Sequence, residues 1–87
     1  MPAKRIRISA HAAFEMRRRG IRRSEVIRTI LNPGQSLPSS KGREIYQRLI
    51  GPKGRLLLRV VVKQAANVYH VITAYKTSKI AKYWRTP

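Results

Sequence analysis

The chain of 87 residues contains 20 Lys and Arg, three Glu and no Asp, which gives a formal net charge of +17. Self-repulsion of this size disfavours a compact state, so the composition indicates a polyanionic partner, and nucleic acid is the first candidate. An apolar content of 43% argues against a disordered basic tail, and the absence of Cys excludes disulfides and thiolate chemistry.

Metal-dependent chemistry lacks its usual ligands in this sequence. Magnesium-dependent nucleases hold their ions through carboxylates, and the three Glu are scattered along the chain. A zinc ion would find only His11 and His70 as nitrogen ligands and no thiolate. We therefore expect no metal and no other cofactor, so that any chemistry on a polyanion is metal-free.

No segment has the pattern of a membrane anchor or a secretory signal. The longest apolar stretch, residues 56–62, is interrupted by Arg59 and is far shorter than the roughly 20 residues of a membrane-spanning helix. The charged N-terminus is followed by no apolar run. Together with the absence of Cys, this predicts a cytoplasmic protein, and the length predicts a single domain over residues 1–87.

The N-terminal half has the periodicity of a short strand followed by two helices. Basic and apolar residues alternate over residues 4–8, which predicts an edge strand. Ser9 as N-cap and Gly20 as terminator bound a first helix over about residues 10–19. A second helix over about residues 23–31 carries an apolar stripe and ends before a Pro-Gly pair.

The C-terminal half changes to a period of two, which indicates a sheet. After a loop rich in Pro, Ser and Gly over residues 32–42, strands are predicted at 43–50, 55–63 and 68–75. Their short connections favour an antiparallel meander, and residues 76–84 add a short fourth strand or a turn-like tail. The predicted fold class is α+β, with two N-terminal helices packed on one face of an antiparallel three- to four-stranded sheet.

The sheet face opposite the helices is expected to be an open basic surface. Alternation along the first two strands places Arg48 and Arg59 there, and the third strand offers the hydroxyls of Thr73 and Tyr75. Residues 76–85 then interleave cations with aromatics, a combination that suits single-stranded nucleic acid. Two structural alternatives stay open: Thr and Tyr are common strand residues, and the tail aromatics would also pack the end of the sheet.

The sequence has three other basic features: His11, His70 and the arginine run over residues 17–23. His11 lies in the first turn of the first helix, where an imidazole near phosphates can act as a base, or simply lie on the helix surface. His70 is expected to be a satisfied core or sheet-edge residue. The arginine run over residues 17–23 wraps around its helix, so most of it is expected to be solvated or to contact phosphates generally.

Several short motifs, in this order along the chain, resemble small bacterial domains related to BrnT. They are Ser9-Ala-His11-Ala, Met16-x-x-Arg19-Gly20-Ile21, the segment from Val26 to Pro33, Gly42-Arg43, the strand that begins at Arg59, Val71-Ile-Thr73-Ala-Tyr75, and the segment from Lys79 to Trp84. Such domains are placed with the RelE, ParE and BrnT toxins and with colicin-type ribonucleases of similar fold. The resemblance covers nearly the whole chain and implies a single RelE/BrnT-like domain.

The resemblance implies a toxin of a bacterial toxin–antitoxin pair that cleaves RNA without a metal. In that chemistry the RNA 2′-hydroxyl attacks the adjacent phosphate and forms a 2′,3′-cyclic phosphate, while cationic side chains stabilise the extra negative charge. The implied partners are RNA, free or on the ribosome, and an acidic antitoxin protein. On this basis the catalytic candidates are His11 for proton transfer, Arg19, Arg59 and Tyr83. The RNA-binding candidates, with the open face and the tail included, are Arg43, Arg48, Thr73, Tyr75, Lys79 and Lys82.

Two other function classes stay open. A non-enzymatic protein that binds RNA or the ribosome would use the same charge, and a ParE-like inhibitor of a host enzyme would need no proton-transfer residue. A helix-turn-helix DNA reader is disfavoured, because the second helix is too apolar to present a free recognition face.

Overall fold

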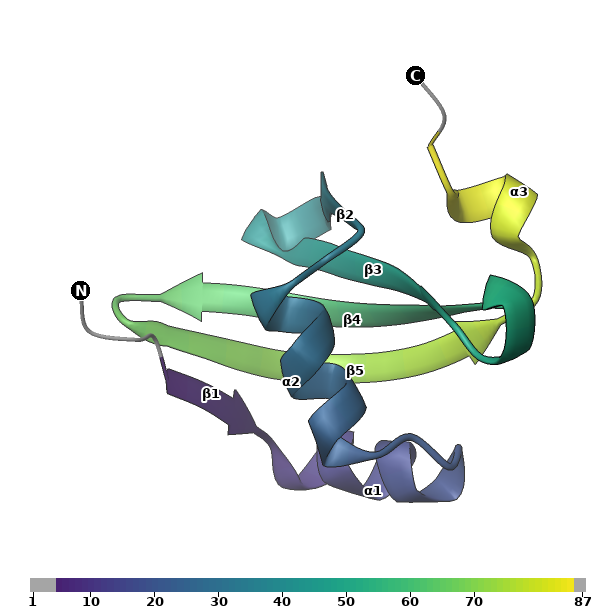
Figure 1. Cartoon of the computed structure of the whole chain (residues 1–87). Helices are drawn as coiled ribbons and strands as arrows, with labels where there is room; N and C mark the ends of the chain where they lie inside the picture. Colours follow the sequence, from purple (N-terminus) through teal and green to yellow (C-terminus); the bar gives the residue numbers. More distant parts are fainter. Residues whose placement is uncertain (1–4, 86–87) are drawn as a thin grey trace.

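Two helices precede and cover the main strands of a sheet in the computed structural model, which describes residues 5–85 (Figure 1). The elements are β1 (Arg5–Ile8), α1 (Ala10–Arg18), α2 (Arg23–Leu31), β2 (Gln35–Pro38), β3 (Glu44–Ile50), β4 (Leu56–Ala65), β5 (Val68–Thr77) and α3 (Ile80–Tyr83), with 3-10 turns at Ser40–Gly42 and Pro52–Gly54. The α+β class and both N-terminal helices are confirmed. The part of the predicted edge strand at Lys4 lies outside the described residues.

Local capping signals explain why α1 and α2 lie where they were predicted. The Ser9 hydroxyl accepts a hydrogen bond from the backbone N–H of Ala12 at 3.0 Å, as an N-cap does. Gly20 has a φ of +68°, which lets the chain reverse after α1 without the steric cost that a Cβ would bring. At the start of α2, a carboxylate oxygen of Glu25 accepts a hydrogen bond from the backbone N–H of Arg22 at 3.0 Å.

The sheet has five strands and is mixed, so the predicted size and the purely antiparallel pairing are wrong. The strand order is β1-β5-β4-β3-β2, and every neighbouring pair is antiparallel except β1 and β5, which are parallel. β2 forms inside the predicted loop, where only four residues alternate between half-buried and exposed. β2 is stabilised by pairing with β3, and that long-range contact leaves no clear local pattern.

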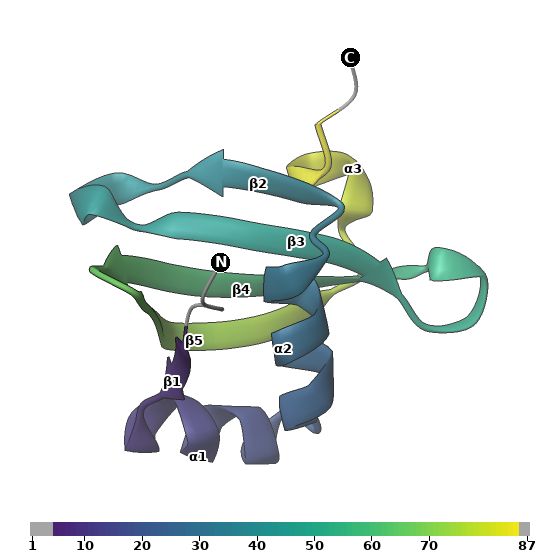
Figure 2. The ribbon, with the colours of Figure 1, turned by 60° about the vertical axis from the view of Figure 1, so that its left-hand side comes forward.

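One hydrophobic core lies between the two helices and one face of the sheet (Figure 2). α2 packs across β3 and β4, and α1 packs against β5. The buried side chains of the helical half are Ala12, Met16, Ile21, Val26 and Ile30, and those of the sheet are Tyr46, Leu58, Val60, Val62, Val71 and Ala74. No helix among residues 5–85 is long and apolar enough to cross a membrane.

A β-bulge in β5 changes which face its first half presents. Val61 lies opposite Thr73, but Val62 lies opposite Val71, so one extra residue stands between them in β5. Val71 therefore faces the core together with Ala74, which simple alternation would forbid. Val71 and Thr73 therefore lie on opposite faces of the sheet, although they are two residues apart in one strand. His70 was predicted to be a core or a sheet-edge residue, and both alternatives are wrong. It is half-buried and points away from the core opposite Lys63, and β5 lies between β1 and β4 rather than at an edge.

The segment after β5 is not a fourth strand of the meander. β5 itself continues to Thr77, and the short helix α3 follows. The Thr77 hydroxyl accepts a hydrogen bond from the backbone N–H of Lys79 at 3.0 Å, which stabilises the bend between the two elements. α3 lies on the sheet face opposite α2, close to β2 and β3 (Figure 2).

Candidate functional site

A nearly buried arginine, Arg59, lies in the middle of the sheet face opposite α1 and α2 and is only 7% exposed. Its Nε donates a hydrogen bond to the Gln47 side-chain oxygen at 2.9 Å, and its Nη1 donates to the Tyr75 hydroxyl at 2.6 Å. The Tyr83 ring covers it, with the guanidinium carbon 4.1 Å from the ring centroid, which is a close cation–π contact. We call Arg59, Gln47, Tyr75 and Tyr83 the Arg59 cluster.

Strand register assembles this cluster. Gln47 on β3, Arg59 on β4 and Tyr75 on β5 lie directly opposite one another in three adjacent strands. Side chains in such a row share one face of the sheet and lie close enough to contact each other. The row therefore depends on pairings between segments far apart in sequence, and Tyr83 is added to it from α3.

Gln47 and Gln35 hold α3 in place over Arg59. Gln47 is fully buried, and its Nε2 donates to the Gln35 side-chain oxygen at 2.7 Å and to the Tyr83 carbonyl at 3.1 Å. The Gln35 side chain in turn accepts a hydrogen bond from the Arg85 backbone N–H and donates one to the Arg85 carbonyl. Neither glutamine is among the predicted site residues, because a strand glutamine ordinarily faces solvent.

The charge of Arg59 is not neutralised by a carboxylate. Among the described residues, the ion pairs are those of Glu15 with Arg18 and Arg19, both on α1. Arg59 instead has a neutral amide, a phenol and a ring face as partners. A guanidinium has five N–H donors, and the hydrogen bonds described above use two of them. The arrangement therefore leaves a fixed positive charge that no described carboxylate neutralises.

Other predicted RNA-binding residues lie around this cluster. The Lys82 ammonium lies 5.3 Å from the centroid of the Tyr83 ring, and Lys79 is exposed directly before α3. Thr73 lies on the same sheet face as Tyr75 and accepts a long hydrogen bond from Arg19 at 3.4 Å. Arg19 also donates to the carbonyl of Ala74 at 2.9 Å, so it links α1 to the edge of β5.

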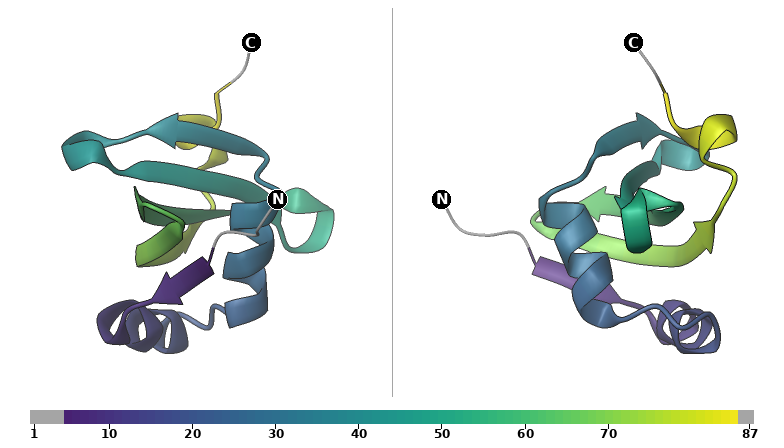
Figure 3. Two further views of the ribbon diagram at one scale, coloured as in Figure 1. Left: turned by 90° about the vertical axis from the view of Figure 1, so that its left-hand side faces the viewer. Right: turned by 45° about the vertical axis from the view of Figure 1, so that its right-hand side comes forward.

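His11 is not brought to the Arg59 cluster. It is exposed on α1, which lies beside β1 and β5, whereas α3 lies towards the opposite edge, beside β2 (Figure 3). The charged group near His11 is the Glu15 carboxylate. The pKa of Glu15 lies below its usual value, chiefly because Arg18 donates a hydrogen bond to it, with smaller effects from the charges of Arg18, Arg19 and His11.

Arg48 and Arg43 also lie apart from the cluster. Arg48 is paired with Leu58, so it points to the helix-covered face, and the prediction that it shares a face with Arg59 is wrong. The error arose because alternation orders residues within a strand, whereas register between strands decides which faces match. Arg43 is half-buried and precedes β3, four residues before Gln47, which is about 13 Å along a strand.

A separate polar group lies at the other end of β3. The Tyr46 hydroxyl donates to a Glu44 carboxylate oxygen at 3.1 Å, and the Gln64 amide donates to the other Glu44 oxygen at 2.8 Å and to the Tyr46 hydroxyl at 3.0 Å. Burial of the phenol, together with the negative charge of Glu44, raises the pKa of Tyr46 to about 12. Among residues 5–85, no three His, Cys, Asp or Glu side chains lie together as a metal site requires.

The raised pKa of Tyr46 predicts a loss of stability in alkali. Between pH 10 and about 12 the unfolded chain releases the phenol proton while the folded chain retains it, so stability is full below pH 10 and falls above it. After solvent screening we expect Tyr46 to account for a decrease of about 1–2 kcal/mol. The decrease is measured by urea unfolding of wild type and Tyr46→Phe between pH 10 and about 12. If the free energies of unfolding of the two proteins fell in parallel with pH, the decrease would not come from Tyr46.

Gly34 provides a test of how the C-terminal segment docks. A Cβ at this position would lie 2.8 Å from the Trp84 ring and 3.2 Å from the Gln47 carbonyl oxygen. Gly34→Ala is therefore expected to push Trp84 outwards and to cost about 1–3 kcal/mol of stability, as overpacking does. Trp84 is the sole Trp, so its fluorescence reports the displacement as a red shift. An unshifted spectrum would mean that the ring does not rest on Gly34. Gly42→Ala, where a Cβ has no neighbour within 4 Å, is the control for the fluorescence shift alone, because the φ of +72° at Gly42 makes an Ala there strained in its own right.

Comparison with known proteins gives a family without an assigned activity. No curated protein and no solved structure matches the chain significantly. Residues 8–76 match the model of a domain of unknown function, DUF4258. The match includes Gln47, Arg59 and Tyr75 and ends before α3, which carries Tyr83. Because the match extends over most of its length, the chain belongs to the DUF4258 family.

Proposed function

We propose that this protein is the toxin of a bacterial toxin–antitoxin pair and cleaves RNA without a metal at the Arg59 cluster. The observation that carries the proposal is the position of Arg59, whose guanidinium is oriented by Gln47 and Tyr75 and paired with no described carboxylate. The net charge of +17 would attract RNA to this surface. The resemblance to BrnT and RelE-like toxins supports the same reading, with an acidic antitoxin as the second partner.

The proposed reaction needs a positive charge that is already in place. The 2′-hydroxyl oxygen attacks phosphorus as a water molecule takes its proton, the bond between phosphorus and the 5′ oxygen breaks, and the released 5′ oxygen takes up a proton. The phosphorus centre carries additional negative charge between these events, and a preorganised guanidinium stabilises it without reorganising. We assign this role to Arg59, and the Tyr83 hydroxyl is the candidate donor to the leaving oxygen.

Access to Arg59 requires movement of α3. The Tyr83 ring covers the guanidinium, which leaves it 7% exposed. α3 has only four residues and is linked to the sheet through Gln47 and Gln35. We therefore expect RNA to displace the Tyr83 ring and then to stack a base on it, as aromatic side chains do in single-stranded RNA complexes.

The decisive assay incubates the purified protein with RNA in EDTA and analyses the new 3′ ends. The proposal predicts 2′,3′-cyclic phosphate ends, loss of cleavage in Tyr83→Ala, and wild-type cleavage in Arg55→Gln, which removes an exposed arginine from a turn. His11→Ala tests the proton-transfer role that the resemblance implies for His11, and because His11 lies apart from the cluster we expect it to retain cleavage.

The near burial of Arg59 favours a second candidate, a non-enzymatic RNA binder in which Arg59 only fixes α3. That candidate predicts intact RNA bound with a steep salt dependence. Growth arrest with intact RNA and altered DNA supercoiling would instead support a ParE-like inhibitor.

A further inference from the structure

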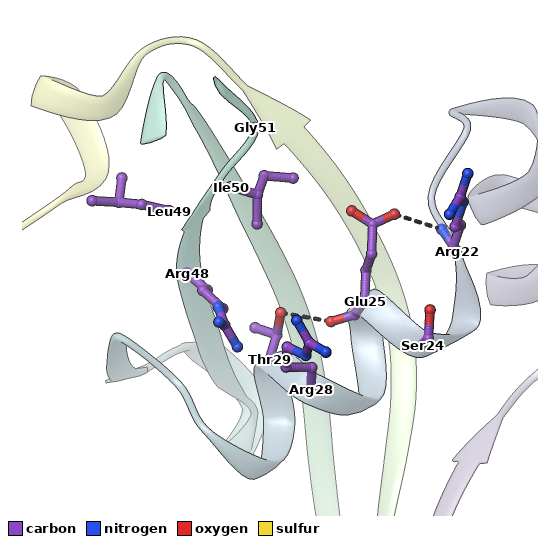
Figure 4. A pocket seen from close by; sticks show the side chains of 9 residues that line it. All are labelled: Arg22, Ser24, Glu25, Arg28, Thr29, Arg48, Leu49, Ile50 and Gly51. Atoms are coloured by element: carbon purple, nitrogen blue, oxygen red, sulfur yellow. Dashed lines mark hydrogen bonds between the residues drawn. The ribbon is translucent and has the colours of Figure 1, made fainter. Parts of the chain in front are cut away.

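A second basic surface lies on the helix-covered side of the molecule, between α2 and the end of β3. It is a cleft of about 630 Å³ into which Arg28 and Arg48 point from opposite walls, with Arg22 at the start of α2 (Figure 4). We call these three residues the cleft arginines. The cleft is separate from the Arg59 cluster, because Arg48 and Arg59 point to opposite faces of the sheet.

The charges in this cleft are largely uncompensated. Glu25 is the acidic residue among those that line the cleft, and its carboxylate accepts a hydrogen bond from the backbone N–H of Arg22. None of the cleft arginines belongs to an ion pair among the described residues, whose ion pairs all involve Glu15. Three guanidinium groups around a cleft of this size therefore favour an anionic ligand with several carboxylates or phosphates.

The same cleft is bordered by an open strand edge. β2 pairs with β3 only as far as Gln47, where Gly34 donates its N–H to the Gln47 carbonyl at 2.9 Å, but β3 continues to Ile50. Backbone groups of a strand point to alternate sides at successive residues, so those of Leu49 point outwards as those of Gln47 do. No other described strand pairs with this edge, and the Leu49 side chain beside it is 39% exposed.

We propose that the cleft and this strand edge bind an extended acidic segment of a partner protein. The segment adds as a strand beside residues 48–50, continuing the line of β2, and places carboxylates against the cleft arginines. Leu49 supplies an apolar contact for one of its side chains. The proposed binding does not depend on ribonuclease activity, since the cleft arginines lie on the sheet face opposite Arg59.

A peptide fits this surface better than RNA does. The outward groups of Leu49 are one N–H and one C=O, and a peptide strand pairs with both. The phosphates of RNA offer only acceptors, and its donors, the 2′-hydroxyls and base N–H groups, do not alternate with acceptors along the backbone as those of a peptide strand do. The Glu25 carboxylate in the cleft would also repel closely spaced phosphates, whereas an alternating acidic and apolar strand can point its carboxylates towards the arginines alone.

The test uses a fluorescein-labelled peptide of alternating Glu and Val, titrated into the full chain. The Arg28→Gln/Arg48→Gln double variant is expected to weaken binding by roughly tenfold or more, because charge-assisted hydrogen bonds are lost. Arg5→Gln/Arg55→Gln removes the same charge from exposed positions outside the cleft and is expected to bind nearly as wild type does. Melting curves of both variants check that the fold is retained.

Two further probes separate the strand edge from general charge attraction. A peptide N-methylated at alternate positions keeps every carboxylate but loses the donors that pair with the edge, and we expect it to bind far more weakly. Amide resonances of residues 48–50 are expected to shift with the unmodified peptide. The proposal would be overturned if the two double variants bound the peptide equally well, or if the methylated peptide bound as tightly as the unmodified one. It would also be overturned if wild type bound no peptide. Shifts of these amides with a short RNA but not with the peptide would assign the surface to RNA instead.

Discussion

Arg59→Met is expected to reduce RNA cleavage by a factor on the order of 10²–10³, the size of the loss when one preorganised donor to a reacting oxyanion is removed. Met keeps the unbranched apolar stem but supplies neither the charge nor the hydrogen bonds to Gln47 and Tyr75. Cleavage rates measured at equal concentrations of folded protein check the effect. Arg55→Met, at an exposed position, is the matched control.

Arg59→Met is also expected to lower the free energy of unfolding. Removing a buried charge relieves its desolvation cost, but the buried Gln47 oxygen loses a donor, and an unpaired buried polar group costs about 1–3 kcal/mol. We therefore expect Arg59→Met to unfold in urea with a free energy lower by roughly that amount. A variant that unfolds like wild type and cleaves within a few-fold of its rate would show that Arg59 neither anchors α3 nor acts on RNA.

Leu58→Ala is expected to cause a large loss of stability. Leu58 is completely buried in β4, within the core that both helices share. Truncation of such a leucine typically costs about 2–5 kcal/mol, because transfer energy is lost and a cavity remains. A domain of this size has a total stability of roughly 4–13 kcal/mol, so the variant is expected to be partly unfolded at mild denaturant concentrations.

The matched control for that prediction is Leu49→Ala, because Leu49 is 39% exposed on the neighbouring strand. Its expected cost is below about 1 kcal/mol, since little apolar area leaves the interior. Urea unfolding of the two variants compares them directly. Equal costs would mean that the core does not lie between β4 and the helices.

The helices were predictable because their signals are local. A capping Ser9, a terminating Gly20 with positive φ and an apolar stripe over α2 determine their bounds within a few consecutive residues. Strands β3 to β5 were predictable as segments for the same reason. The register between these strands was not predictable. Register places Arg48 on the sheet face that α2 covers and places Gln47 opposite Arg59.

β2 and the bulge in β5 were beyond sequence reasoning because each depends on a pairing partner. β2 has four residues, and Gln35 within it becomes structural only through Gln47 and Arg85. The bulge moves Val71 into the core without any Gly or Pro to mark it. In the candidate site, Arg59, Tyr75 and Tyr83 were identified separately, and their assembly by the buried Gln47 and the half-buried Gln35 could be seen only in the folded chain.

The central claim is that the Arg59 cluster cleaves RNA. The most direct test measures how much 2′,3′-cyclic phosphate wild type and Arg59→Met produce from the same RNA in EDTA, with equal amounts of folded protein. We predict cyclic ends from wild type and from Arg55→Met, and almost none from Arg59→Met. Intact RNA with wild type, or the same yield of cyclic ends from Arg59→Met, would contradict the assignment of catalysis to the Arg59 cluster.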